Sequence, residues 1–140
     1  MRDAFLKQLE ELHKMLAEMG RLCEEMIDGT YEALMNMDRE QAAKILQDDA
    51  NVDLKERDIE SKCLKLLLEQ QPVASDLRKI SSALKMITDL ERIGDQAGDI
   101  AEIIKTTDLL EPVKATRLGE MAKAVASMVR ESIESFANED

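Results

Sequence analysis

Two runs of acidic side chains are spaced so that each lies along one face of a helix. The first run comprises Asp49, Asp53, Glu56 and Glu60, and the second comprises Glu91, Asp95, Asp99 and Glu102. Steps of three and four residues place the members of each run side by side on the helix, where like charges repel unless something compensates them. Carboxylates without a nearby His or Cys are the donors that hard or borderline cations prefer. The two runs therefore indicate a cation site.

The phase of these acids is unusual. Asp49, Glu56 and Glu91 fall on positions that the heptad pattern otherwise fills with apolar residues. A desolvated carboxylate without a partner costs several kcal/mol, so such placement needs a compensating interaction. Gly94 and Gly98 follow Glu91 in the same seam, although glycine weakens a helix interior. Residues this small either admit a close neighbouring helix or leave room for a bound ion.

The two runs are expected to meet across a helical hairpin. Asp53 and Glu91 both lie roughly 27–30 Å along the helix from the turn near Gln71, at about 1.5 Å per residue. Antiparallel packing would bring Asp49 and Asp53 next to Glu91 and Asp95. The alternative is a pair of solvated acidic faces, balanced by bases such as Lys55, Arg57 and Arg92. The residue pattern alone leaves both interpretations open.

The elements that must position these acids are long amphipathic helices. Apolar residues recur at alternating steps of four and three in four stretches: Phe5 to Met37, Ala42 to Leu66, Leu77 to Ala101 and Leu118 to Phe136. The linkers between them are short, so neighbouring helices should be antiparallel. We predict an all-α fold, an antiparallel helical bundle of long helices.

The ends of these helices have recognisable signals. Asp38 followed by Gln41 predicts a capping box at the start of the second helix. That helix should stop near Gln70, because Pro72 disfavours helix in the residue before it. Pro72 itself fits the first turn of the third helix, which is expected to run to about Thr106.

Composition narrows the class of protein. The net charge of −11 argues against nucleic acid as a partner, since phosphates attract Lys and Arg. No apolar run approaches the roughly 20 residues that a bilayer crossing needs, and the first residues lack an export signal. Cys23 and Cys63 are far apart among apolar positions, which is typical of reduced core cysteines. These features favour a cytoplasmic protein.

An internal repeat relates the fourth helix to the first. A shift of 102 positions pairs Leu16 with Leu118, Met19 with Met121 and Met26 with Met128. The alternative is chance similarity between two amphipathic helices. If the repeat is real, residues 109–140 are the first helix of an incomplete second repeat, following a first unit at 1–108.

Three separated motifs resemble the PhoU family of phosphate-uptake regulators. They are Asp49-Ala50-Asn51-Val52-Asp53, the segment from Gln71 to Arg78, and Asp89-Leu90-Glu91-Arg92-Ile93-Gly94-Asp95 with its continuation to Glu102. They occur in the family's order, and the resemblance covers essentially the whole chain. Members of this family are built from tandem three-helix bundles, which implies a three-helix repeat plus a fourth helix here.

The resemblance implies a metal-binding negative regulator rather than an enzyme. Its metal motifs, an acid followed four residues later by Asp, match Asp49 with Asp53 and Glu91 with Asp95, and Asp99 extends the second motif. The implied ligands are divalent or iron-type metal cations. The implied partners are the phosphate transporter's ATPase subunit and its sensor histidine kinase, with membrane association only through them. On this resemblance the chain holds a first repeat and only the first helix of a second.

Two other functions are compatible with a helical acidic chain. A histidine phosphotransfer bundle would use His13, the single histidine, but the residues after it lack the glycine-containing turn of such sites. A purely structural bundle would leave the acidic runs without a ligand. The sequence also lacks Glu-x-x-His pairs for a di-iron oxidase, nucleotide-binding glycine loops and a Ser/His/Asp constellation.

The apolar stripe of the fourth helix predicts that this helix covers the first three helices or crosses to a second copy of the chain. We therefore expect a homodimer.

Overall fold

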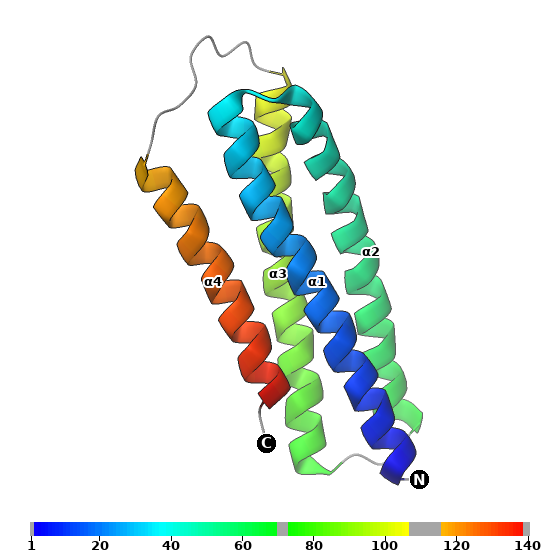
Figure 1. Ribbon diagram of the computed structural model, residues 1–140. Helices are drawn as coiled ribbons and strands as arrows, with labels where there is room; N and C mark the ends of the chain where they lie inside the picture. The colour runs from blue at the N-terminus through cyan, green and yellow to red at the C-terminus, as the bar shows by residue number, and fades with distance from the viewer. Residues whose placement is uncertain (1, 70–72, 107–115, 139–140) are drawn as a thin grey trace.

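The computed structural model is an antiparallel bundle of four long helices (Figure 1). It describes the backbone of residues 2–69, 73–106 and 116–138, and the side chains of residues 3–68, 73–106 and 123–134. The helices are α1 (Arg2–Asn36), α2 (Arg39–Glu69), α3 (Ala74–Thr106) and α4 (Thr116–Asn138). The predicted all-α fold is confirmed, and α2 ends within one residue of the expected position. No helix in the described ranges is long and apolar enough to cross a membrane.

The turn between α1 and α2 is built from two local motifs. Met37 adopts a positive φ of 51°, and the Asp38 N–H donates to Ala33 O at 2.9 Å, which closes α1 with a Schellman-type turn. Asp38 then caps α2, because its Oδ1 accepts from the Gln41 N–H at 3.1 Å. The predicted cap is therefore present, but the reciprocal half of the capping box is wrong. The Asp38 N–H is already satisfied, so the Gln41 amide donates instead to Glu32 Oε2 at 3.0 Å.

The start of α3 uses the half of the capping box that α2 lacks. The Val73 N–H donates to Asp76 Oδ2 at 3.1 Å, and Val73 O accepts from the Asp76 N–H at 2.9 Å. Asp76 is only 2% exposed, so this cap is an internal part of the hairpin. The expected place of Pro72 in the first turn falls outside the described residues; the helix as described begins at Ala74.

The core is the seam where α1, α2 and α3 meet. The α1 stripe follows the predicted heptad, with Phe5, Leu12, Leu16, Met19 and Met26 at 2% exposure or less. Both cysteines are buried free thiols, as predicted, and the Cys23 thiol contacts Leu90 O at 3.4 Å. Burial raises the pKa of Cys23 to about 12, which keeps this thiol protonated. Side chains of this size contribute about 1.5–3 kcal/mol each when fully buried, so the seam dominates stability.

The predicted core stripe of α3 is only partly right. Five of its residues are buried as expected: Ile80, Ile87, Gly94, Gly98 and Ala101. Leu77 was also placed in the seam, yet it is 43% exposed, and Leu84 is only partly buried. The other buried α3 residues are Asp76, Ala83, Leu90, Ala97 and Ile104.

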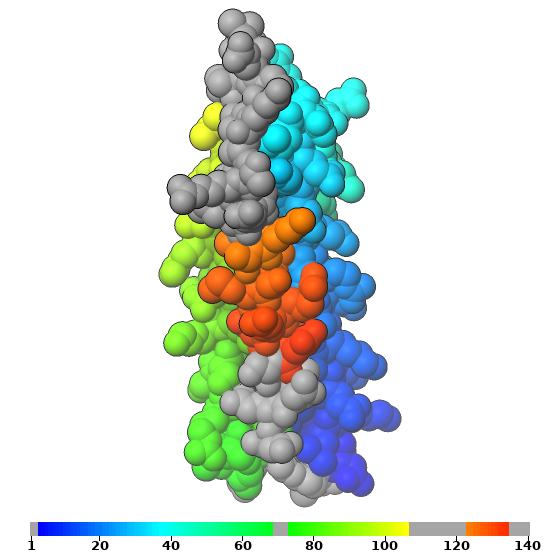
Figure 2. Space-filling model, turned by 60° about the vertical axis from the view of Figure 1, so that its left-hand side comes forward, coloured from blue at the N-terminus to red at the C-terminus, as the bar shows by residue number. Residues whose placement is uncertain are grey.

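The fourth helix packs mainly along α1 and touches α3 less. Figure 2 shows α4, in orange and red, lying on the outer surface between α3 and α1. The contact with α1 is close, because a Cβ at Gly20 would overlap Ile133 Cδ1. Arg130 also donates to Glu24 Oε2 on α1 at 3.1 Å. The prediction that α4 covers the first three helices is thus confirmed for its α1 side.

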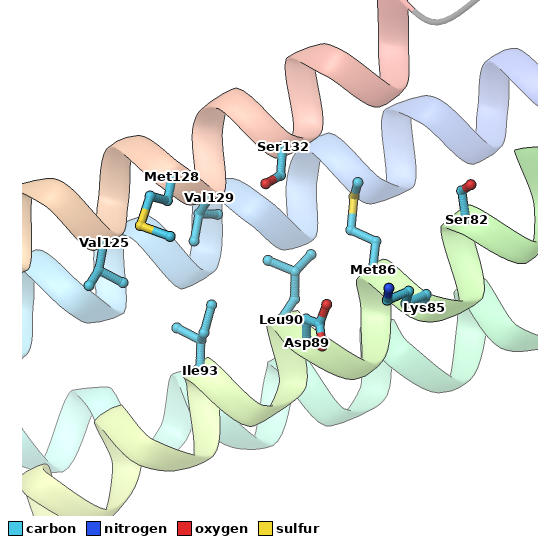
Figure 3. Close-up of a pocket in the computed structure, with 10 residues that line it drawn as sticks. All are labelled: Ser82, Lys85, Met86, Asp89, Leu90, Ile93, Val125, Met128, Val129 and Ser132. Atoms are coloured by element: carbon cyan, nitrogen blue, oxygen red, sulfur yellow. The ribbon is translucent and has the colours of Figure 1, made fainter.

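The predicted stripe of α4 was only partly right. Val129 is buried as expected, but Val125 and Ser132 are exposed, and Ala126 and Ile133 pack inward instead. The side chains of Leu118, Ala122 and Phe136 lie outside the described residues. Between α4 and α3 a groove of about 330 Å³ remains, with Met86, Ile93, Val125 and Met128 among its walls (Figure 3).

Candidate metal centre

Three aspartates from two helices converge on one point of the α2–α3 hairpin. Asp49 and Asp53 lie one turn apart on α2, and Asp95 lies opposite them on α3. One carboxylate oxygen of each lies within 4.8 Å of the other two. Two oxygens on opposite sides of a cation bound at about 2.4 Å would be separated by roughly this distance. The spacing therefore suits a single shared cation.

The two α2 carboxylates have oxygens that are buried without satisfaction. Oδ1 of Asp49 and Oδ1 of Asp53 are both shielded from solvent and have no hydrogen-bond partner among the described residues. A buried acceptor without a partner costs about 1–3 kcal/mol, and more when it carries charge. Asp49 also fills the space left by a glycine, because a Cβ at Gly98 would stand 3.0 Å from Asp49 Oδ2. The room predicted at Gly98 thus receives the carboxylate itself.

Crowding changes the proton affinity of this group. Burial, followed by the charges of Asp95 and Asp53, raises the pKa of Asp49 to about 6 from 3.8. Burial likewise raises the pKa of Asp53, with Asp95 and Glu91 adding to the effect and Arg57 opposing it. Both shifts mean that the charged forms lack compensation in the protein alone. A bound cation would supply it.

A second acidic pair lies next to these aspartates, toward the turn of the α2–α3 hairpin. Glu56 of α2 lies against Glu91 of α3. Burial first, and then this pairing, raise the pKa of Glu56 to about 7. Glu91, predicted to join Asp49, Asp53 and Asp95, is not one of the three convergent aspartates, but it is near enough to raise the pKa of Asp53 as well as that of Glu56. Its part in the metal site stays a prediction. Glu56 was recognised as a charge in the seam but was not included in the site.

The other charged residues near the three aspartates compensate their charge only in part. Asp99, predicted as an extension of the site, is close enough to Asp49 to raise its pKa, although it is not one of the three convergent aspartates. Of the bases named as alternative partners, Lys55 pairs with Glu18 of α1 at 3.4 Å. Arg57 acts on Asp53 only partially, since burial and the neighbouring acids raise the pKa of Asp53 in spite of it.

His13 lies apart from this site, on α1 and partly buried. Burial, with a smaller contribution from the charge of Lys79 on α3, lowers its pKa, while Glu10 opposes the change. The ring is thus held toward its neutral form at the α1–α3 contact. This environment offers no specific support for the phosphotransfer alternative.

Comparison with known proteins identifies the family. The family model described as the PhoU domain matches residues 16–104, which include both acidic runs. The chain belongs to the PhoU family. The crystal structure of PhoU from Pseudomonas aeruginosa superposes with a TM-score of 0.88 at 33% sequence identity, covering 97% of this chain and 66% of that one. The predicted resemblance is therefore confirmed.

Curated relatives in the PhoU family carry the name of a transport-system component. The phosphate-specific transport system accessory protein PhoU homolog of Clostridium acetobutylicum is 38% identical over 137 residues, covering 96% of this chain and 63% of the relative. The homolog of the same name from Aquifex aeolicus is 37% identical over 135 residues, covering 96% and 61%. These names describe an accessory protein rather than an enzyme. The chain spans about three fifths of their length.

Proposed function

We propose that this chain is a metal-binding regulator of phosphate uptake and phosphate-starvation signalling. It would act as an adaptor on the phosphate transporter's ATPase subunit and its sensor histidine kinase. Family membership and the relatives' names support a role beside the phosphate transport system. The convergence of Asp49, Asp53 and Asp95 carries the metal-binding part of the proposal.

The donor set fits a divalent or iron-type cation. The three aspartates offer only oxygen ligands, which suit Mg²⁺, Mn²⁺, Ca²⁺ and iron better than a soft metal. Asp49 and Asp53 each direct an unsatisfied buried oxygen into the structure, and Asp95 is exposed to solvent at the mouth of the site. A cation held by these residues neutralises their charge and links α2 to α3. Asp99, near Asp49, and Glu91, near Asp53, would be the additional ligands if more than one cation binds.

Metal analysis of the purified chain tests this assignment. We expect bound metal after purification, or an increase in melting temperature when Mn²⁺, Fe²⁺ or Mg²⁺ is added to the metal-free protein. Asp49→Asn and Asp95→Asn should remove the response. Asp58→Asn is the matched control, because Asp58 is an exposed α2 acid outside the three convergent aspartates. Metal-free protein with no thermal response to any of these cations would refute the site.

The regulatory part needs a cellular readout. Deleting the gene in its own organism should raise a phosphate-starvation reporter under phosphate-replete conditions, and the 140-residue chain should restore repression. Asp49→Asn/Asp95→Asn at equal protein level should restore it less. Unchanged reporter activity in the deletion strain would contradict the proposed role, whatever the metal analysis shows.

A further inference from the structure

The hairpin end of the bundle exposes apolar side chains that the metal site does not use. Leu64 is 48% exposed and Leu68 is 85% exposed in the last turns of α2, while Val73 and Leu77 are 54% and 43% exposed at the start of α3. Single exposed apolar residues are ordinary, but a group gathered at one place marks an interaction surface. We call these four residues, with Lys65 and Arg78, the hairpin-end surface.

Two of these residues lie on the same face as the carboxylates. Leu64 follows Asp53 by about three helical turns, and Leu77 precedes Asp95 by about five turns, at 3.6 residues per turn. The register that sets Asp49 beside Asp95 and Glu56 beside Glu91 places Leu68 level with the first turn of α3. The α2–α3 hairpin is therefore acidic at the metal site and apolar toward its turn, at the lower end of both helices in Figure 1.

The cap of α3 fixes the backbone of Val73 in a position that exposes its side chain. Its N–H donates to the Asp76 carboxylate at 3.1 Å, and its carbonyl accepts from the N–H groups of Asp76 and Leu77 at 2.9 and 3.0 Å. The backbone of Val73 is thus fixed on both sides while its side chain faces solvent. A preorganised apolar residue loses little entropy on binding, which favours a docking role.

The charge around this surface is opposite to that of the rest of the molecule. Residues 61–81 contain Lys62, Lys65, Arg78 and Lys79 against only Glu69 and Asp76, in a chain whose net charge is −11. Asp76 is buried in the cap, and Lys62 pairs with Glu11 at 2.8 Å. Lys65 and Arg78 are exposed beside the four apolar residues. The hairpin end thus joins apolar contact area to positive charge.

We propose that the hairpin-end surface docks an acidic segment with an apolar face on the phosphate transport system, an inference that rests on the proposed function. Opposite charges would orient the partner, and Leu68 with Val73 would supply the central apolar contact. An anionic membrane surface shares the same attraction to Lys and Arg. It is disfavoured because the chain as a whole, at −11, is repelled from anionic lipid.

Co-sedimentation with reconstituted vesicles tests this surface. The probe is the cognate phosphate transporter in phosphatidylcholine vesicles, compared with empty vesicles of phosphatidylcholine and of phosphatidylcholine with phosphatidylglycerol. Leu68→Asp and Lys65→Glu/Arg78→Glu should each weaken binding to transporter vesicles by about tenfold or more. Val73→Ser keeps a good N-cap residue at the start of α3, so it removes the apolar contact while the helix is retained.

Leu54→Asp is the matched control, because Leu54 is another α2 leucine, 55% exposed, and the change adds the same charge. It should bind like the unmodified chain. If the unmodified chain binds and Leu68→Asp, Val73→Ser and Lys65→Glu/Arg78→Glu bind equally well, the docking surface is wrong and the proposed function stands. If the unmodified chain does not bind the transporter vesicles, both the docking surface and the proposed function are wrong. Equal binding to empty anionic vesicles would identify lipid as the ligand and overturn the protein-partner assignment.

Discussion

At the scale of single residues, Gly98 and Asp49 act as one unit. The glycine leaves space that the Asp49 carboxylate occupies, and the carboxylate is thereby brought toward Asp95 instead of solvent. Glycine costs a helix interior about 1 kcal/mol relative to alanine, so retaining it in α3 has a local energetic cost. The position of Asp49 is the compensating feature that the structure offers.

Gly98→Ala should therefore separate stability from metal binding. The new methyl would stand 3.0 Å from Asp49 Oδ2 and 3.2 Å from its Cγ, so the carboxylate has to move. Helix propensity improves, and we expect metal affinity to fall by about tenfold, as when groups that orient a ligand are altered. Gly29→Ala is the control, because its Cβ would make ordinary contact with Ile45 Cδ1 at 3.4 Å. Isothermal titration with Mn²⁺ measures the affinity of both variants. Equal affinities of Gly98→Ala and Gly29→Ala would argue against this role for Gly98.

The raised carboxyl pKa values predict a specific pH dependence of the metal-free protein. The pKa of Asp49 rises from 3.8 to about 6 and that of Glu56 from 4.5 to about 7 in the folded state. The folded state thus binds these protons more tightly, so their contribution is fully present below the unfolded pKa values and is lost as pH rises through the folded ones. In EDTA the melting temperature should fall between about pH 4 and 7. Asp49→Asn/Glu56→Gln should flatten that fall.

At the scale of elements, periodicity predicted each helix but not always its inward face. In α1 the stripe from Phe5 through Met26 is correct, because large apolar residues occupy a single phase. In α3 the predicted Ile80, Ile87 and Ala101 are buried. Leu77 is 43% exposed, however, and Ala83 is buried in place of the predicted Leu84, which is only partly buried. Apolar residues stand next to each other at such points, so the spacing alone admits either neighbour and the packing of the helices decides between them.

The candidate site was also predictable only in part. Steps of four and the equal distance from the hairpin were enough to bring Asp49, Asp53 and Asp95 together. Glu91 lies near both Asp53 and Glu56, since it raises the pKa of each, and its part in the metal site stays a prediction. The level of each acid along its helix follows from the sequence, whereas the direction of each carboxyl group depends on the packing of the side chains.

The packing of α4 on α1 includes one especially close contact between the two helices. Because Gly20 leaves room for Ile133, Gly20→Leu should push α4 away from α1 and destabilise the protein by about 1–3 kcal/mol, as overpacking does. Hydrogen exchange should rise within residues 123–134 while α2 stays protected. Adding Ile133→Ala should recover part of the loss. Uniformly increased exchange in all four helices would mean that α4 does not open separately.

At the scale of the whole molecule, α4 leaves exposed an apolar face whose counterpart on α1 is buried. The shift of 102 positions pairs Val125 with Cys23 and Met128 with Met26. Cys23 and Met26 are fully buried among α1, α2 and α3, whereas Val125 and Met128 are 38% and 65% exposed beside the groove toward α3. A repeat of sequence is thus accompanied by unequal burial. On α1 this face packs against α2 and α3, whereas the corresponding face of α4 is exposed to solvent.

This open face is where we expect two copies of the chain to meet. Light scattering at micromolar concentration should give the mass of a homodimer, since burial of Val125 and Met128 against a second copy removes apolar area from water. Met128→Lys should shift the chain to a monomer without lowering its melting temperature at low concentration. Leu54→Lys, on the exposed surface of α2, should remain a dimer, and so should the hairpin variant Leu68→Asp. A monomeric mass for the unmodified chain would contradict the homodimer, and a Met128→Lys dimer would place its interface elsewhere than on α4.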